Sequence, residues 1–188
     1  MSHLKPEVSN ADHCAGPEDA PVTLVEYGDY ECPYCGQAYP IVEAVRKALG
    51  PKLRFVFRNF PLGEVHPHAT RAAEAAEAAA AQGKFWEMHD LLYEHQKALD
   101  DPHLLQYAKR LGLDVERVQQ ELEADTHFER VRSDFNSGVR SGVNGTPTFF
   151  VNGERLDDAW TFEGLMGAIE RASHGREAKR VASRETSG

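Results

Sequence analysis

This 188-residue chain has neither long apolar runs nor an excess of positive charge. Its opening residues, MSHLKPEVSNADHCAGPEDAP, contain no apolar stretch of signal-peptide length, and no later stretch is long and apolar enough to span a membrane. The formal net charge of -9 leaves no basic face for nucleic acid. We therefore expect a cytoplasmic protein that binds neither nucleic acid nor membrane. A periplasmic or extracellular location would apply if a signal sequence had been removed.

Cysteine is also scarce. Three residues, Cys14, Cys32 and Cys35, are too few for a disulfide scaffold, and their number is odd. In the cytoplasm a CxxC pair more often serves redox or metal chemistry than a structural disulfide. His13 and Cys14 could complete a zinc site with the pair, but adjacent ligands are strained and no second spaced pair is present.

The order of predicted elements indicates one α/β domain with strands at both ends of the chain. Residues 21–29 and 52–60 have strand patterns, and 34–49 between them has a helical pattern, which predicts a parallel pair with a right-handed crossover. Only helical patterns follow until TPTFFVNGERL, where Asn152-Gly153 predicts a hairpin. We divide the chain into an irregular N-terminal arm (1–20), the first part of the sheet domain (21–64), a helical insertion (65–141), the second part of the sheet domain (142–174) and a polar, frayed tail (175–188).

The CPYC segment carries the clearest chemistry. Cys32 follows a predicted strand, and Cys35 lies in the first turn of the next helix, which Pro33 suits as its first residue. A helix N-terminus offers unpaired N–H groups and positive dipole character, so it lowers the pKa of a thiol placed there. The thiolate is the form that attacks disulfides. We expect Cys32 to be the more exposed nucleophile and Cys35 to be covered and to resolve the mixed disulfide.

Three segments, VTLVEYGDYECPYC, QGKFWEMHDLLYEHQ and GVNGTPTFFVNG, resemble bacterial members of the DsbA-like branch of the thioredoxin superfamily, and the likeness covers about residues 15–172. The resemblance implies a thioredoxin-like α/β fold, β-α-β then β-β-α, with an all-helical insertion. It also implies a thiol–disulfide oxidoreductase without a cofactor. Such an enzyme exchanges disulfides with protein thiols through a mixed disulfide, and a redox partner resets its cysteine pair. We expect a monomer.

The resemblance also assigns roles to single residues. Thr146-Pro147 resembles the cis-proline loop that faces the CxxC pair and holds the substrate chain, although a trans proline opening a strand is the alternative. Glu26 matches a buried acidic residue that helps to move protons; otherwise it is a solvent-facing glutamate. We place Pro33 and Tyr34 with Thr146 in the substrate-binding surface, and Pro147 and Glu26 with the catalytic residues.

Several questions stay open at this point. The dipeptide Pro33-Tyr34 departs from the Pro-His of the strongly oxidising family member and favours a more reducing couple, but the sequence does not give the direction. A glutathione-dependent kappa-type transferase or isomerase is one alternative, although those proteins usually carry a lone serine. A zinc-binding or non-catalytic interaction module is another. Cys14 is an incidental thiol or a third redox cysteine. His66 and His68 fit a helix-start surface role better than a metal role.

Overall fold

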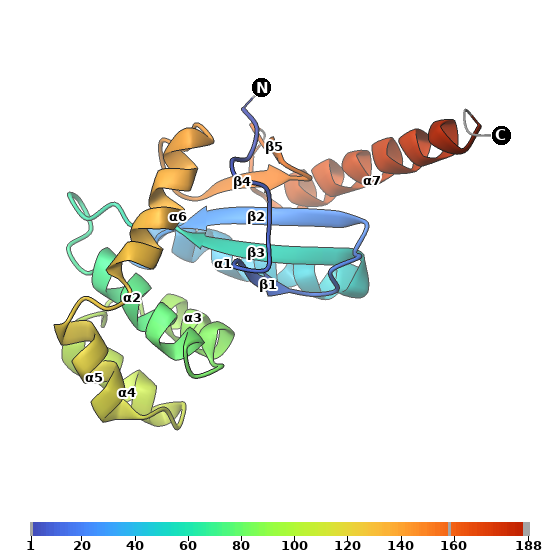
Figure 1. Cartoon of the computed structure of the whole chain (residues 1–188). Coiled ribbons are helices and arrows are strands. Elements are labelled where there is room, and N and C mark those ends of the chain that lie inside the picture. Colours follow the sequence, from blue (N-terminus) through green and yellow to red (C-terminus); the bar gives the residue numbers. More distant parts are fainter. Residues whose placement is uncertain (1, 158, 186–188) are drawn as a thin grey trace.

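A computed structural model describes residues 2–157 and 159–185, in which a five-stranded sheet carries helices on both faces and a helical block at one end (Figure 1). The strands are β1 (His13–Ala15), β2 (Val22–Gly28), β3 (Leu53–Asn59), β4 (Thr148–Val151) and β5 (Glu154–Arg155). The helices are α1 (Pro33–Leu49), α2 (Ala69–Ala80), α3 (Phe85–Glu94), α4 (Asp101–Arg110), α5 (Val115–Glu123), α6 (Phe128–Arg140) and α7 (Phe162–Glu185), with a 3₁₀ turn at Gly50–Lys52.

The sheet has the order β1-β3-β2-β4-β5. Strands β2 and β3 are parallel and joined through α1, as the sequence predicted, whereas β4 runs antiparallel to β2 and continues into β5. The β4–β5 turn is formed by Asn152 and Gly153, both with positive φ angles, of 48° and 85°. These values fit the predicted hairpin, because tight hairpin turns require positive φ at both central residues.

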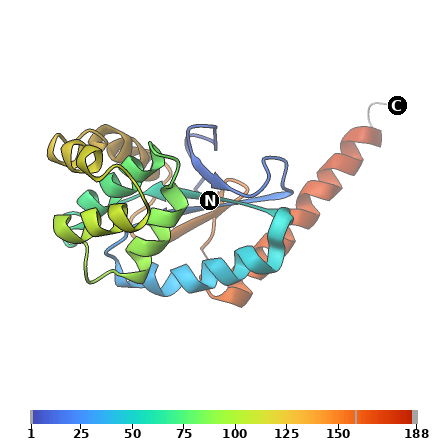
Figure 2. The same cartoon turned by 90° about the horizontal axis from the view of Figure 1, so that it is seen from below.

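The central strand β2 is buried on both faces, so each face has its own core. Leu24 belongs to the larger cluster, on the face covered by α1 and the start of α7 (Figure 2). Val25 and Tyr27 point the other way, into a smaller cluster beneath the N-terminal arm and near α6. Because side chains alternate along a strand, Glu26 shares the face of Leu24 and lies under α1.

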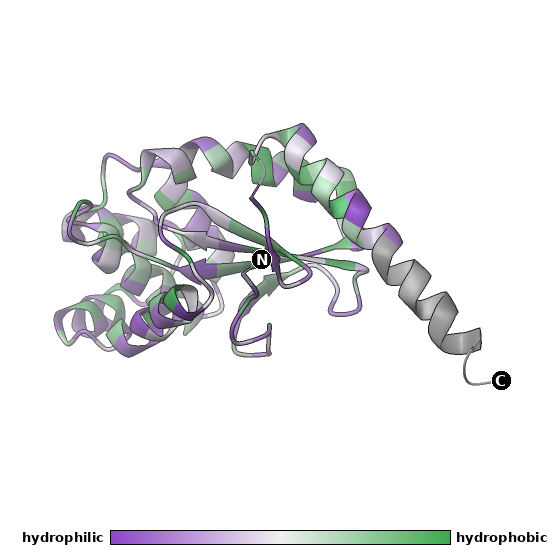
Figure 3. Cartoon of the chain, turned by 90° about the horizontal axis from the view of Figure 1, so that it is seen from above, coloured by the Kyte–Doolittle hydropathy of each residue, from purple (hydrophilic) through white to green (hydrophobic). Residues whose placement is uncertain are grey.

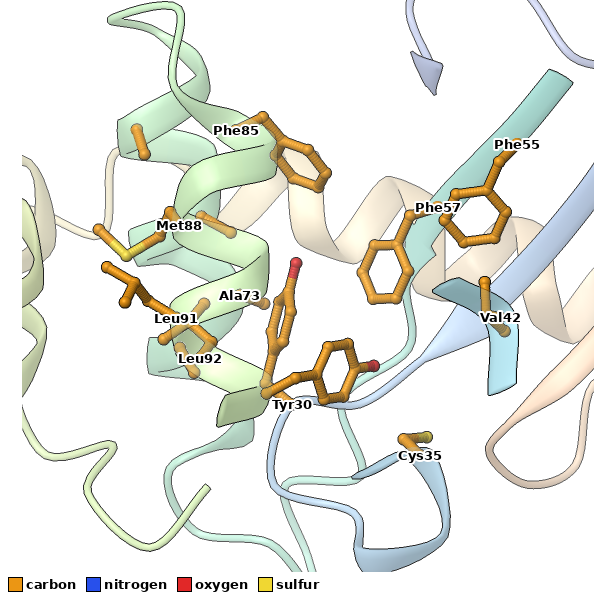
Figure 4. Packing of buried hydrophobic residues seen from close by; sticks show 14 of the residues in the cluster. Tyr30, Cys35, Val42, Phe55, Phe57, Ala73, Phe85, Met88, Leu91 and Leu92 are labelled. Atoms are coloured by element: carbon orange, nitrogen blue, oxygen red, sulfur yellow. The ribbon is translucent and has the colours of Figure 1, made fainter. Parts of the chain in front are cut away.

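The helical block α2–α6 lies between β3 and β4 in the chain. Its helices show polar and apolar residues around each turn (Figure 3), as expected for helices half covered by neighbours. Helix α3 contributes Phe85, Met88 and Leu92 to the core, and Figure 4 shows Phe85 pointing toward Phe57 and Tyr30 lying between α3 and Cys35 of α1. The block therefore packs directly against the segment that carries the cysteine pair.

The N-terminal arm differs from its predicted irregular form. Residues of the arm form β1, which pairs antiparallel with the edge of β3. The buried side chain of Arg58 then fixes the arm, because it donates to Asp12 at 2.7 and 3.0 Å and to the carbonyl of Pro6 at 3.1 Å. A buried guanidinium needs such partners, so the arm is part of the folded domain.

Two helix ends also differ from expectation. Thr126 and Glu129 have the spacing of a capping box, which predicts a helix start at Thr126, but α6 starts at Phe128 and its N-cap is His127, without a side-chain cap. The helix α7 runs on to Glu185 through most of the segment expected to be a frayed tail. Residues 186–188 of that predicted tail lie outside the described residues.

Candidate active site

The two cysteines lie at the junction of β2 and α1. Cys32 is the N-cap of α1, Pro33 is its first residue, and Cys35 sits in its first turn, as predicted. Both cysteines are free thiols. Cys32 is 3% exposed and Cys35 is fully buried. The expected order of exposure is therefore present, although Cys32 is far more covered than we expected.

The surroundings shift the pKa values of the two thiols in opposite directions. A hydrogen bond from the Cys35 thiol and the backbone N–H groups of Tyr34 and Cys35 favour the Cys32 thiolate, and they lower its pKa to about 5 against the effect of burial. Burial raises the pKa of Cys35 well above its ordinary value, and its hydrogen bond to Cys32 adds to this. At neutral pH one sulfur is thus an anion and its neighbour keeps its proton.

The loop before β4 faces Cys32. The Thr146–Pro147 peptide bond is cis, as the family resemblance implied. The Cys32 sulfur lies 3.4 Å from the Thr146 carbonyl oxygen, to which only its protonated form can donate, and the Thr148 hydroxyl donates to the Gly145 carbonyl at 2.7 Å, which holds the loop. Residues 114 positions apart in the chain therefore meet at the nucleophile. Pro147 remains partly exposed beside it.

Glu26 is buried beneath the pair. It is 2% exposed, and burial raises its pKa to about 8, with Glu43 adding to the increase and Arg46 opposing it. Its Oε1 has no hydrogen-bond partner among the described residues, and neither has the buried hydroxyl of Tyr93. The negative charge of Glu26 is also among the influences that raise the pKa of Cys35. A carboxyl group with this pKa keeps its proton at neutral pH.

Two further residues shape the loop before Cys32, and sequence reasoning missed both. The buried carboxylate of Asp29 accepts from the backbone N–H groups of Glu31 at 2.8 Å and Cys32 at 3.2 Å. The Gln96 amide donates to the carbonyls of Tyr30 and Cys32, each at 2.9 Å. Both residues lie in quoted segments, YGD and EHQ, but nothing in the sequence indicates that Gln96 reaches a loop 64 residues away.

The remaining candidates are placed apart from the sulfur atoms. Tyr34 is 62% exposed, next to an exposed Pro33, so both are available to a substrate. Cys14 lies on β1, and its sulfur accepts from Arg54 at 3.2 Å. His13 bonds to Glu77 at 2.9 Å. Within the part of the chain that the structure describes, no group of three or more His, Cys, Asp or Glu side chains is arranged to hold a metal ion.

A family model described as thioredoxin matches residues 8–171. The chain belongs to the thioredoxin family. The five-stranded sheet, the strand–CxxC–helix junction and the cis-proline loop fit this family, and the helices between β3 and β4 fit its DsbA-like members. The predicted recognition and fold class are thus confirmed.

Solved structures support the same assignment. The chain is similar to oxidised BdbD from Bacillus subtilis, with 24% identity, a TM-score of 0.82 and coverage of 93% of this chain and 98% of that one. A thioredoxin-like oxidoreductase from Silicibacter pomeroyi has 30% identity and a TM-score of 0.77, with coverage of 87% and 93%. The general function that these neighbours support is thiol–disulfide oxidoreduction.

The chain is also similar to part of a much longer protein that is named as an ion transporter. The chain is 48% identical over 184 residues to the Na(+)/H(+) antiporter NhaA 1 of Salinispora arenicola. This match covers 97% of the chain but only 28% of the relative, so the chain spans little more than a quarter of that protein's length. Among the described residues, none of the helices combines the length and apolar character needed to cross a bilayer.

Proposed function

We propose that this chain is a thiol–disulfide oxidoreductase that passes its Cys32–Cys35 disulfide to protein thiols. The observation that carries the proposal is the pairing of a stabilised Cys32 thiolate with a protonated Cys35, facing the cis-proline loop. The reduced form of the pair contains this thiolate, so whatever stabilises the thiolate makes the disulfide a stronger oxidant. The preference for a more reducing couple rested on the Pro33-Tyr34 dipeptide and on the expected cytoplasmic location, whereas the Cys35 thiol and backbone N–H groups favour the thiolate here.

The proposed reaction has two exchanges. A substrate thiolate attacks the Cys32 sulfur, the Cys32–Cys35 bond breaks, and Cys35 leaves and takes up a proton, for which Glu26 is the nearby buried carrier. A second substrate thiolate then attacks the substrate sulfur of the mixed disulfide, and Cys32 leaves as a thiolate. Two substrate thiols have lost two electrons, the enzyme pair has gained them, and one proton is released because Cys32 stays ionised.

The substrate surface follows from what is exposed around the nucleophile. Tyr34 and Pro33 lie on one side of Cys32, and the Thr146–Pro147 loop lies on the other. An extended peptide placed between them can hydrogen-bond to the loop backbone next to its own reacting sulfur. We assign Thr146, Pro33 and Tyr34 to substrate binding, and a separate redox partner reoxidises the pair after each turnover.

The first test is the equilibrium of the pair with a glutathione buffer, read by trapping free thiols. We expect one reversible two-electron couple with a potential less negative than about -200 mV, the side of the oxidising family members. Cys32→Ser should abolish the couple, and Cys14→Ser, the matched control, should leave it unchanged. A potential well below that value would reverse the direction, and absence of a reversible couple in the folded wild-type protein would refute the function.

A trapping variant identifies partners. Cys35→Ser cannot form the intramolecular disulfide, so it traps partners from the reverse direction. Its Cys32 thiolate attacks a disulfide of the partner, one partner sulfur leaves as a thiolate, and the mixed disulfide accumulates because Cys35 is no longer there to resolve it. We expect disulfide-bonded partner proteins after non-reducing separation, with Cys32→Ser/Cys35→Ser as the blank. The antiporter relatives make a cation transporter one partner to look for. One solved neighbour is described as periplasmic, which fits the alternative location, and the comparisons give no support to a cytoplasmic one.

A further inference from the structure

The segment His66-Pro67-His68 has no role in the reaction described above, yet it lies against the loop that carries the nucleophile. His66 Nδ1 lies 2.8 Å from Asp29 Oδ2, and His68 Nδ1 lies 2.9 Å from Glu31 Oε1. Two imidazoles that flank Pro67 therefore meet two carboxylates on the segment just before Cys32. The sequence favoured a helix-start surface role for both histidines. In the structure both also contact carboxylates of the loop before Cys32.

The two histidine pairs are not equivalent. The carboxylate of Asp29 is fully buried, and the side chain of His66 is 18% exposed. In contrast, the side chain of His68 is 47% exposed, and that of its partner Glu31 is 19% exposed. Solvent screens an exposed pair strongly and a covered pair much less. The pair with an electrostatic effect on its surroundings is therefore His66 with Asp29.

A single carboxylate links His66 to the nucleophile. Asp29 Oδ2 contacts His66 and also accepts from the backbone of Leu62 at 2.8 Å. Asp29 Oδ1 accepts from the backbone N–H groups of Glu31 and Cys32. When His66 is neutral, the full negative charge of this carboxylate acts on the Cys32 thiolate. When His66 is protonated, that charge is balanced, and the imidazolium adds an attraction of its own.

The side chains that raise the pKa of His66 are all acidic. Burial lowers the pKa of His66, but the hydrogen bond and charge of Asp29 outweigh it, followed by the charges of Cys32 and Glu31, so that its pKa is raised from the ordinary value of 6.5. Glu31 in turn is paired with His68. The interaction between His66 and Cys32 is reciprocal, because a charge that holds a proton on the imidazole is itself stabilised by that proton.

We propose that His66 is a positioning residue that supplies the positive charge missing from the Pro33-Tyr34 dipeptide, so that protonation of His66 makes the Cys32–Cys35 couple more oxidising. The inference rests on the proposed function, since it concerns the potential of the same pair. Protonated His66 attracts Cys32 more strongly when the Cys32–Cys35 pair is reduced than when it is oxidised, because only the reduced pair carries the thiolate charge.

The first experiment compares wild-type protein with His66→Asn in glutathione buffers from about pH 5.5 to about pH 8.5. Asn places an N–H near the position of Nδ1, so it keeps the bond to Asp29 and removes the charge. We expect the variant to favour the disulfide roughly three- to tenfold more than wild type at the acidic end. The difference between the two proteins should shrink as the pH rises, because His66 loses its proton. His68→Asn, the matched control, should stay within about twofold of wild type throughout.

The second experiment needs no folded variant. The titration of His66 is followed by NMR in the reduced and oxidised wild-type protein, and the pKa should be higher in the reduced form. Equal values in the two forms would overturn the proposal, and so would a difference between wild type and His66→Asn that does not change with pH, which marks a purely structural role. If the wild-type pair shows no reversible couple at all, the proposed function fails and the inference fails with it.

Discussion

Replacing Glu26 by glutamine should make the stability of this protein much less sensitive to alkaline pH. Glu26 is fully buried, and burial raises its pKa from about 4.5 to about 8. Between these two values the folded protein keeps a proton that the unfolded chain has released, so the free energy of unfolding falls as pH rises and levels off above pH 8. At about 1.4 kcal/mol per pH unit, the loss reaches at most about 5 kcal/mol.

The assay is urea unfolding at several pH values, on a Cys32→Ser/Cys35→Ser background so that thiol ionisation does not contribute. The amide that Glu26→Gln introduces cannot ionise, so this variant should lack the decline between about pH 4.5 and about pH 8. Burying an unpaired amide costs about 1–3 kcal/mol of its own, but this cost is the same at every pH. The informative quantity is therefore the difference between the two unfolding free energies as a function of pH.

A difference that rises by several kcal/mol toward alkaline pH agrees with a neutral, buried Glu26. Two parallel curves would refute the reasoning, because they would mean that Glu26 ionises near its ordinary value in the folded protein. In that case it could not hold a proton for Cys35 at neutral pH. The same experiment thus tests the proton carrier in the proposed reaction.

Three further predictions concern the supports of the site. The ultraviolet absorbance of the Cys32 thiolate should titrate with a midpoint near pH 5, and Cys14→Ser should keep this step whereas Cys32→Ser should lose it. Gln96→Ala should lower the free energy of unfolding by about 1–3 kcal/mol, measured in urea, because two carbonyls of the cysteine loop lose their donor. Arg58→Met should cost about 3–5 kcal/mol because it leaves the Asp12 carboxylate without its partner, and adding Asp12→Asn should restore part of the thermal stability. An Arg58→Met protein as stable as wild type would contradict a fixed N-terminal arm.

Local patterns in the sequence were sufficient to predict most of the fold. The parallel strands, their crossover helix and the Asn152-Gly153 hairpin each depend on neighbouring residues, and all three are present. The position of the Cys32–Cys35 pair at a strand–helix junction is local in the same sense. The cis bond before Pro147 depended on family resemblance, because a sequence of this kind is also compatible with a trans proline.

The features that sequence reasoning missed are produced by distant contacts. Strand β1 has only three residues without alternation, and it is a strand because it pairs with the edge of β3. The contact of Asp29 with His66 joins residues 37 positions apart, and Gln96 reaches across 64 positions to Cys32. No spacing rule connects such residues, so their roles are apparent only once the chain is folded.

These distant contacts bear on how the direction of such a redox pair is determined. The dipeptide between the cysteines is only one source of charge near the thiolate, and here it provides an exposed Tyr34. The donors and charges around the loop come instead from Asp29, His66 and Gln96. His66 lies between β3 and α2, and Gln96 follows α3, so both belong to the part of the chain that contains the helical block. Two proteins with the same CPYC sequence can therefore differ in potential if their inserted helices differ. In this protein the chain between β3 and β4 contributes to the candidate site, because His66 and Gln96 supply hydrogen bonds to the loop before Cys32.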